Sequence, residues 1–159
     1  MRKMPKHLAK IHWALEGDGF LNGRYSREHS WEFDGGVRVA ASPSPHVVPT
    51  PWSNPAHVDP EEAFVAAVAS CHMLTFLWLA SRAGLEVREY TDHAEGVMSK
   101  NDQGVAWVSQ ITLQPAIRWG PTPPSHETLS HLHHEAHSQC FIANSIKTKV
   151  TVAPPPHQM

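Results

Sequence analysis

The chain has 159 residues, of which 41% are hydrophobic and 18% are charged, and its formal net charge is -2. This composition is typical of a soluble globular protein, and the lack of a basic excess argues against nucleic acid or a membrane surface as a partner. Two cysteines are too few for a disulfide scaffold, and they form no C-x-x-C pair for structural zinc. The basic N-terminus lacks the apolar run of a signal peptide, so we expect a cytoplasmic protein with a single domain over residues 1–159.

The N-terminal part of the chain predicts three β-strands and a long loop. Alternating apolar residues over 8–15 predict a half-buried strand, and residues 31–33 and 37–39 flank a glycine turn that predicts a β-hairpin. Residues 42–60 form a proline-rich loop, whose length is more typical of a functional loop than of a plain connection. A packed surface wrap or a dimer arm is the alternative.

A long helix is predicted over residues 60–82. Asp59 is a good N-cap, Pro60 suits the first helical position, and Gly84 ends the helix. Its apolar stretch, 63–80, has the minimum length of a membrane span, but His72 would then lie at the bilayer centre, where polar groups are costly. We therefore expect a long buried central helix, covered by neighbours on most sides.

The C-terminal half predicts strands over 86–98 and 105–119, a helix near 125–143, a strand over 146–152 and a tail over 153–159. In this helix Cys140 shares a face with Leu132 and Ala136. The element order is therefore β-β-β-α-β-β-α-β. With strands in antiparallel neighbours and helices inserted between them, the predicted class is α+β.

The two cysteines have two open interpretations. Each could be an inert core residue, since cysteine is among the most buried residue types, or the two could meet as a redox pair. A reactive Cys71 must be a thiolate, yet it lies about 15 Å beyond the start of its helix, too far for the helix dipole to act. A nearby cation is required, and Arg24 and Arg27 in the N-terminal loop are better candidates than Arg82.

The segment 59–71, DPEEAFVAAVASC, resembles the (T)NPEE-L-x-A-A-x-x-x-C helix of the OsmC/Ohr family of thiol peroxidases. The segment 140–145, CFIANS, is similar to the C-P-x-S-N segment of that family, and the element order matches as well. Asp59, Phe141, Ala143 and His72 depart from the family pattern, which indicates a divergent branch.

The resemblance implies a cysteine-based hydroperoxide reductase. Cys71 corresponds to the peroxidatic cysteine, which becomes a sulfenic acid, and Cys140 to the resolving cysteine, which forms a disulfide with it. Glu61 corresponds to a glutamate that pairs with an active-site arginine, for which we favour Arg27 over Arg24. The family also implies an intertwined homodimer with shared active sites, no cofactor, and an external thiol or lipoyl-type dithiol as the reductant.

The histidines of the second helix permit a metal interpretation. His133, His137 and Cys140 lie at i, i+4 and i+7, a spacing that zinc accepts. Because the spacing is not H-E-x-x-H, we expect a polar helix face and no metal. A protonated His72 or His137 beside the nucleophile could instead lower its pKa.

Aromatic residues of the first helix, Phe64, Phe76 and Trp78, favour an organic hydroperoxide over hydrogen peroxide as the substrate. Two alternatives stay open, both homodimers with the same fold. One is a non-catalytic protein that binds a small ligand, and the other is a zinc-binding protein.

Overall fold

The computed structural model describes residues 4–154. Contacts within the chain define two compact units, residues 1–63 and 64–159. Residues 155–159 of the predicted tail lie outside the described range.

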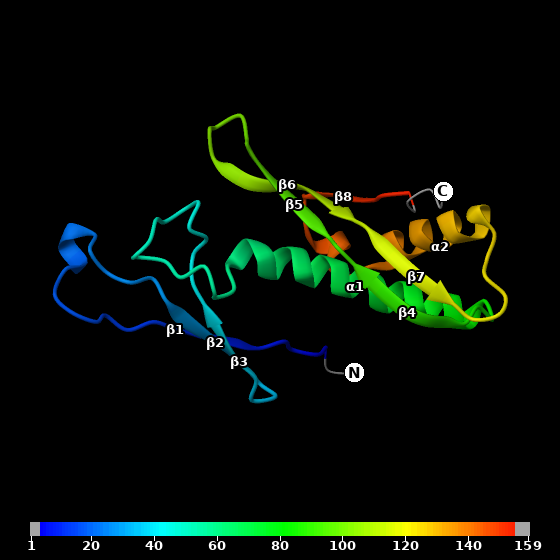
Figure 1. Ribbon diagram of the computed structural model, residues 1–159, viewed down its shortest axis with the longest axis horizontal. Coiled ribbons are helices and arrows are strands. Elements are labelled where there is room, and N and C mark those ends of the chain that lie inside the picture. Colours follow the sequence, from blue (N-terminus) through cyan, green and yellow to red (C-terminus); the bar gives the residue numbers. More distant parts are fainter. Residues whose placement is uncertain (1–3, 155–159) are drawn as a thin grey trace. The chain divides into compact units, whose positions relative to one another are not determined.

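The first unit is built on an antiparallel sheet of three strands, β1 (Ala9–His12), β2 (His29–Phe33) and β3 (Arg38–Ala41), in the order β1-β2-β3 (Figure 1). The β2–β3 hairpin confirms the prediction: Gly36 has a φ of 86° and donates its N–H to the Phe33 carbonyl at 2.9 Å. The half-buried face predicted for β1 is wrong, since all four of its residues are exposed. No cluster of buried apolar side chains forms within residues 4–63 to cover it.

Helix α1 (Pro60–Arg82) has the bounds that its sequence signals predict. Its start is a capping box, in which Asp59 Oδ1 accepts from Glu62 N–H at 2.8 Å and Glu62 Oε2 accepts from Asp59 N–H at 3.1 Å. Gly84, with a φ of 72°, adopts the left-handed conformation that ends the helix.

The burial of α1 differs from the prediction. Its fully buried residues are Val68, His72, Phe76 and Ala80, spaced four apart along one face. On the opposite face, Leu74 is 62% exposed. The helix is long and apolar enough to cross a membrane, but its buried face packs in a protein core, as expected of a helix in a folded domain.

In the second unit, each of the two strands predicted after α1 is divided in two. Strands β4 (Val87–Asp92) and β5 (Glu95–Lys100) are followed by β6 (Ala106–Leu113) and β7 (Pro115–Trp119). β5 pairs with β6 and β4 pairs with β7, so the four strands form one long hairpin with a break. At the break Pro115 has no N–H to donate, and Asp92 Oδ1 accepts from Gln114 N–H at 2.7 Å.

Helix α2 (His126–Gln139) ends four residues earlier than predicted, because Cys140 is extended, with φ -68° and ψ 117°. A 3₁₀ turn, η2 (Ala143–Ser145), and a short strand, β8 (Lys149–Val152), follow. β8 is shorter than the predicted 146–152, and it pairs parallel with β6, which corrects the prediction of antiparallel neighbours throughout.

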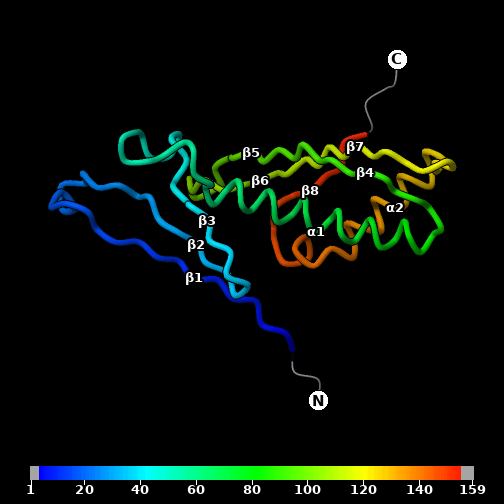
Figure 2. The backbone as a smooth tube through the Cα atoms, turned by 60° about the horizontal axis from the view of Figure 1, so that its bottom comes forward, coloured from blue at the N-terminus to red at the C-terminus, as the bar shows by residue number. Residues whose placement is uncertain are grey.

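Two cores of buried residues hold the second unit together. Phe76 and Ala80 of α1 pack against Leu132 and Ala136 of α2, and Val68 of α1 packs in a second cluster against two residues of β6. Figure 2 shows the strands of this unit as one layer with both helices on the same side of it. The mixed arrangement of strands and helices confirms the predicted α+β class.

Candidate functional site

The structure brings the two cysteines together, although they are far apart in the sequence. Cys71 lies in the middle of α1, and Cys140 directly follows the last turn of α2. Both are free thiols, and Cys71 is near enough to Cys140 to raise the pKa of its thiol. The fold therefore makes the two thiols neighbours within a single chain.

The two thiols differ in their surroundings. Cys140 has no exposed surface, whereas Cys71 is half-buried. Burial raises the pKa of the Cys140 thiol, and the neighbouring Cys71 side chain raises it further. Both causes favour the protonated form of Cys140.

The turn after α2 fixes the position of Cys140. The backbone N–H of Ala143 points at the Cys140 sulfur from 3.5 Å. The Asn144 side-chain amide donates to the carbonyls of Ser138 and Cys140, both at 2.9 Å. This local network explains why Cys140 stays buried although it lies outside the helix.

His72 of α1 and His133 of α2 form a pair between these two helices. His72 Nε2 and His133 Nδ1 are 3.0 Å apart, and the His133 ring stacks on Phe76 with a centroid distance of 4.4 Å. Burial lowers the pKa of both imidazoles to about 4, and for His72 the neighbouring His133 and His137 contribute to this lowering. Both rings are therefore neutral at pH 7, so His72 is not the protonated neighbour of the nucleophile that the sequence left open.

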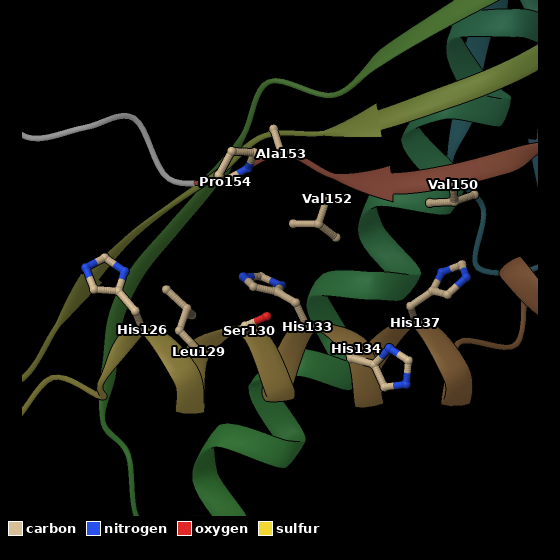
Figure 3. Close-up of a pocket in the computed structure, with 10 residues that line it drawn as sticks. All are labelled: His126, Leu129, Ser130, His133, His134, His137, Val150, Val152, Ala153 and Pro154. Carbon is tan, nitrogen blue, oxygen red and sulfur yellow. The ribbon is translucent and has the colours of Figure 1, made fainter.

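A cavity of about 480 Å³ lies between α2 and β8 (Figure 3). His133 and His137 extend from α2 toward β8, whose Val150 and Val152 form the opposite wall. His133 thus connects the buried His72 with this cavity, and the wall facing it is apolar.

In the first unit, Arg27 is held by backbone carbonyls and an aromatic ring. Its Nη1 donates to the carbonyls of Gly23 at 3.1 Å and Tyr25 at 2.7 Å. Its guanidinium carbon lies 3.8 Å from the centre of the Tyr25 ring. A cavity of about 540 Å³ opens here, and the residues that line it are Trp13, Phe20, Tyr25, Arg27, His29, Pro43 and Pro60.

Within the described residues, Glu61 forms no ion pair with Arg27, the arginine that we favour as its partner from the family resemblance. Among residues 4–154, Glu61 takes part in no ion pair, and Arg27 is engaged by carbonyls instead. Arg24 donates only its backbone N–H, to the Gly19 carbonyl at 2.9 Å. Arg27 is one of the residues that line the cavity of the first unit.

The zinc interpretation finds no geometric support in the described part of the chain. No three side chains of His, Cys, Asp or Glu converge there as metal ligands would. His133 Nδ1 is already paired with His72 Nε2, at 3.0 Å.

Comparison with protein families matches residues 53–154 to the OsmC-like protein family. The match spans most of the chain and includes both thiols. The chain belongs to the OsmC-like protein family. This confirms the resemblance that the two cysteine segments predict.

Solved structures of OsmC-like proteins share the fold. An OsmC-like protein of unknown function from Vibrio cholerae is 47% identical, with a TM-score of 0.91 over 94% of this chain and 99% of that one. Organic hydroperoxide resistance proteins from Legionella pneumophila and Elizabethkingia anophelis are 16% and 18% identical. Each has a TM-score of 0.70 over 96% of this chain and 99% of its own, which is a likeness in fold. Comparison with curated proteins gives no match.

Sequence reasoning did not single out Tyr25 as a site residue of this OsmC-like protein, and it named His133 only as a possible zinc ligand. Tyr25 lies two positions before Arg27, a spacing that puts both side chains on the same side of an extended segment. His133 lies one helical turn before His137, on the same face of α2. Phe76, by contrast, is a core residue with no exposed surface and does not face a substrate.

Proposed function

We propose that this OsmC-like protein is a thiol-dependent peroxidase that reduces organic hydroperoxides through Cys71 and Cys140. The observation that carries the proposal is the proximity of the two thiols, of which Cys71 is half-buried and Cys140 fully buried. A nucleophile must be reachable by its substrate, whereas a resolving thiol needs only to reach the nucleophile. The difference in exposure therefore supports Cys71 as the nucleophile.

The reaction begins when the Cys71 thiolate attacks the distal oxygen of the hydroperoxide. The O–O bond breaks, the alkoxide takes up a proton and leaves as an alcohol, and the sulfur becomes a sulfenic acid. The Cys140 sulfur then attacks the Cys71 sulfur, and its proton leaves with the sulfenic hydroxyl as water. An external thiol or lipoyl-type dithiol reduces the resulting disulfide and is itself oxidised, so the cycle needs no bound cofactor.

Arg27 is the arginine that we assign to the peroxide, with Glu61 as its charge partner in the complete site. Glu61 lies ten residues before Cys71 on a straight helix, so one copy of α1 cannot bring both to the same peroxide. We therefore propose an intertwined homodimer in which the two copies share their active sites. The open apolar face of α1 supports this proposal.

The aromatic walls around Arg27 support an organic substrate over hydrogen peroxide. Three aromatic rings line this cavity, and they offer apolar surface that hydrogen peroxide cannot use. The solved relatives described as organic hydroperoxide resistance proteins agree with this choice.

The test is the consumption of cumene hydroperoxide with dithiothreitol as the reductant. We expect Cys71→Ser to abolish turnover and Cys140→Ser to keep part of it, because dithiothreitol can reduce a sulfenic acid directly. Mass spectrometry after one equivalent of peroxide should find a peptide crosslink between Cys71 and Cys140. Equal rates in the wild type and in Cys71→Ser would refute the peroxidase function.

A second candidate function is the binding of a small organic molecule without catalysis. The cavity between α2 and β8 favours it, because imidazoles and apolar side chains line about 480 Å³ there. A thermal-shift screen of small organic compounds on the wild type and on Ser130→Leu, which fills this cavity, would test it. Binding by the wild type alone, in a protein without peroxidase turnover, would favour this alternative.

A further inference from the structure

Arg27 is held differently from an arginine in an ion pair. No carboxylate lies within 4.0 Å of its guanidinium among residues 4–154. The Tyr25 ring takes this place, with its centre 3.8 Å from the guanidinium carbon. At such a distance the attraction between cation and ring holds the guanidinium over the ring face.

The Tyr25 ring is itself fixed by two neighbouring aromatic residues. Phe20 lies 4.7 Å from it and Trp13 lies 5.6 Å from it, edge-on, measured between ring centroids. The Trp13 indole N–H donates to the Ser26 carbonyl at 2.9 Å, which ties this cluster to the segment that carries Arg27. The Tyr25 ring is therefore packed against two neighbouring rings.

The stacked guanidinium keeps hydrogen-bond donors for a ligand. Arginine has five N–H donors, and Arg27 uses only Nη1 in its two bonds to backbone carbonyls. Its Nε and Nη2 donors have no partner within the described residues. A hydroperoxide oxygen can accept from these donors while its organic group packs on the aromatic walls of the same cavity.

We propose that Tyr25 is a positioning residue, which holds Arg27 by stacking so that its free N–H groups meet the hydroperoxide. This inference rests on the proposed peroxidase function. A ring under the guanidinium face engages none of its N–H groups, so the Nε and Nη2 donors stay available both to the hydroperoxide and to Glu61 in the complete site. Tyr25 thus orients Arg27 without using the donors that the substrate needs.

The first test compares Tyr25→Leu, which removes the ring, with Tyr25→Phe, which keeps it and removes only the hydroxyl. We expect Tyr25→Leu to lower kcat/KM for cumene hydroperoxide by between about 2-fold and about 30-fold, the range of a cation–π contact. Tyr25→Phe should stay within about 2-fold of the wild type. In an Arg27→Lys background the same Tyr25→Leu change should have a much smaller effect, because the two residues act together.

The second test observes the stacking itself and needs no enzymatic activity. In the wild type and in Tyr25→Phe, the ring current should shift the Arg27 side-chain proton resonances upfield, and in Tyr25→Leu the shift should disappear. Unshifted Arg27 resonances in the wild type, or an unchanged kcat/KM in Tyr25→Leu, would overturn the inference. A wild type that consumes no hydroperoxide would instead overturn the proposed function, and the resonances would still report whether Tyr25 holds Arg27.

Discussion

The contrast between the two thiols predicts different reactivities for them. Cys140 is fully buried and its pKa is raised, whereas Cys71 is half-buried. Alkylation requires an accessible thiolate, and each unit of pKa changes the thiolate fraction about tenfold. The reagent is iodoacetamide at about pH 7.5, somewhat below the pKa of a free thiol. We expect Cys71 in the Cys140→Ser variant to react at least about tenfold faster than Cys140 in the Cys71→Ser variant.

Mass spectrometry of timed samples measures both alkylation rates, and the same variants in urea provide the control. The two rates should become similar once the proteins are unfolded, because burial no longer separates the sites. Equal rates in the folded proteins would mean that Cys140 is as accessible as Cys71, contrary to the geometry of the site.

The buried histidine pair predicts that the protein loses stability in acid. The pKa of His72 is lowered from 6.5 to about 4, so between these values the unfolded chain binds a proton that the folded protein does not. The stabilisation is complete above pH 6.5 and is lost as the pH falls toward 4. Since each pKa unit corresponds to about 1.4 kcal/mol, the loss attributable to His72 over the whole range is on the order of 3 kcal/mol.

Urea unfolding at neutral pH and at about pH 4.5, where a free histidine is protonated, measures this loss of unfolding free energy. In His72→Phe the fall in unfolding free energy between the two conditions should be smaller by about 2 kcal/mol. The exposed His126 serves as the matched control, and His126→Gln should behave like the wild type. If His72→Phe and the wild type lose equal stability, His72 is not a neutral buried group.

At the residue scale, some of the site could be predicted from the sequence. The cysteine segments are local motifs, so Cys71 and Cys140 could be identified, although their contact depends on how α1 meets α2. The pairing of His72 with His133 joins residues 61 positions apart, and no local pattern encodes it. The stacking of Arg27 on Tyr25 replaces a carboxylate contact that the family pattern implied, because the backbone turn places two carbonyls and a ring at the guanidinium.

Among the secondary structure elements, β5 and α1 approach each other closely at a glycine. A Cβ added to Gly96 would lie 2.5 Å from Val65 Cγ2, too close for two carbon atoms. Gly96→Ala should therefore force β5 away from α1 and destabilise the protein by about 1–3 kcal/mol. Urea unfolding followed by circular dichroism measures the change.

The Val65→Ala variant tests the cause of this destabilisation. Because it removes the methyl group that the new Cβ would meet, Gly96→Ala should be less harmful in the Val65→Ala background. If the two effects simply add, the crowding between β5 and α1 is not the reason.

The predictability of the elements follows from how local their signals are. The bounds of α1 were predictable because Asp59 and Gly84 lie at its ends and act on adjacent backbone. The division of the predicted strands 86–98 and 105–119 was not, because the break is set by pairing across the hairpin. The parallel pairing of β8 with β6 likewise depends on the packing of the whole second unit.

For the whole molecule, the face of α1 opposite its buried stripe is an exposed apolar surface. Leu74 and Trp78 on this face are 62% and 56% exposed, although the helix lies in the middle of the chain and is largely apolar. Large exposed apolar surfaces on soluble proteins usually mark an interface. We propose that a second copy of the chain covers this face of α1. The second copy would also bring a second Glu61 and a second Arg27 to the thiols.

The final prediction is that the protein is a dimer and that peroxide reduction depends on it. Sedimentation at micromolar concentration should give twice the chain mass of 17.7 kDa. Leu74→Glu places a charge in the buried interface, so it should yield monomers and lower turnover, since burying an unpaired charge is costly. Val105→Glu alters an equally apolar residue, 56% exposed in the turn before β6, and should leave both mass and turnover unchanged. A wild type that sediments as a fully active monomer would show that a single chain completes its own site, and Glu61 would then have no role beside the thiols.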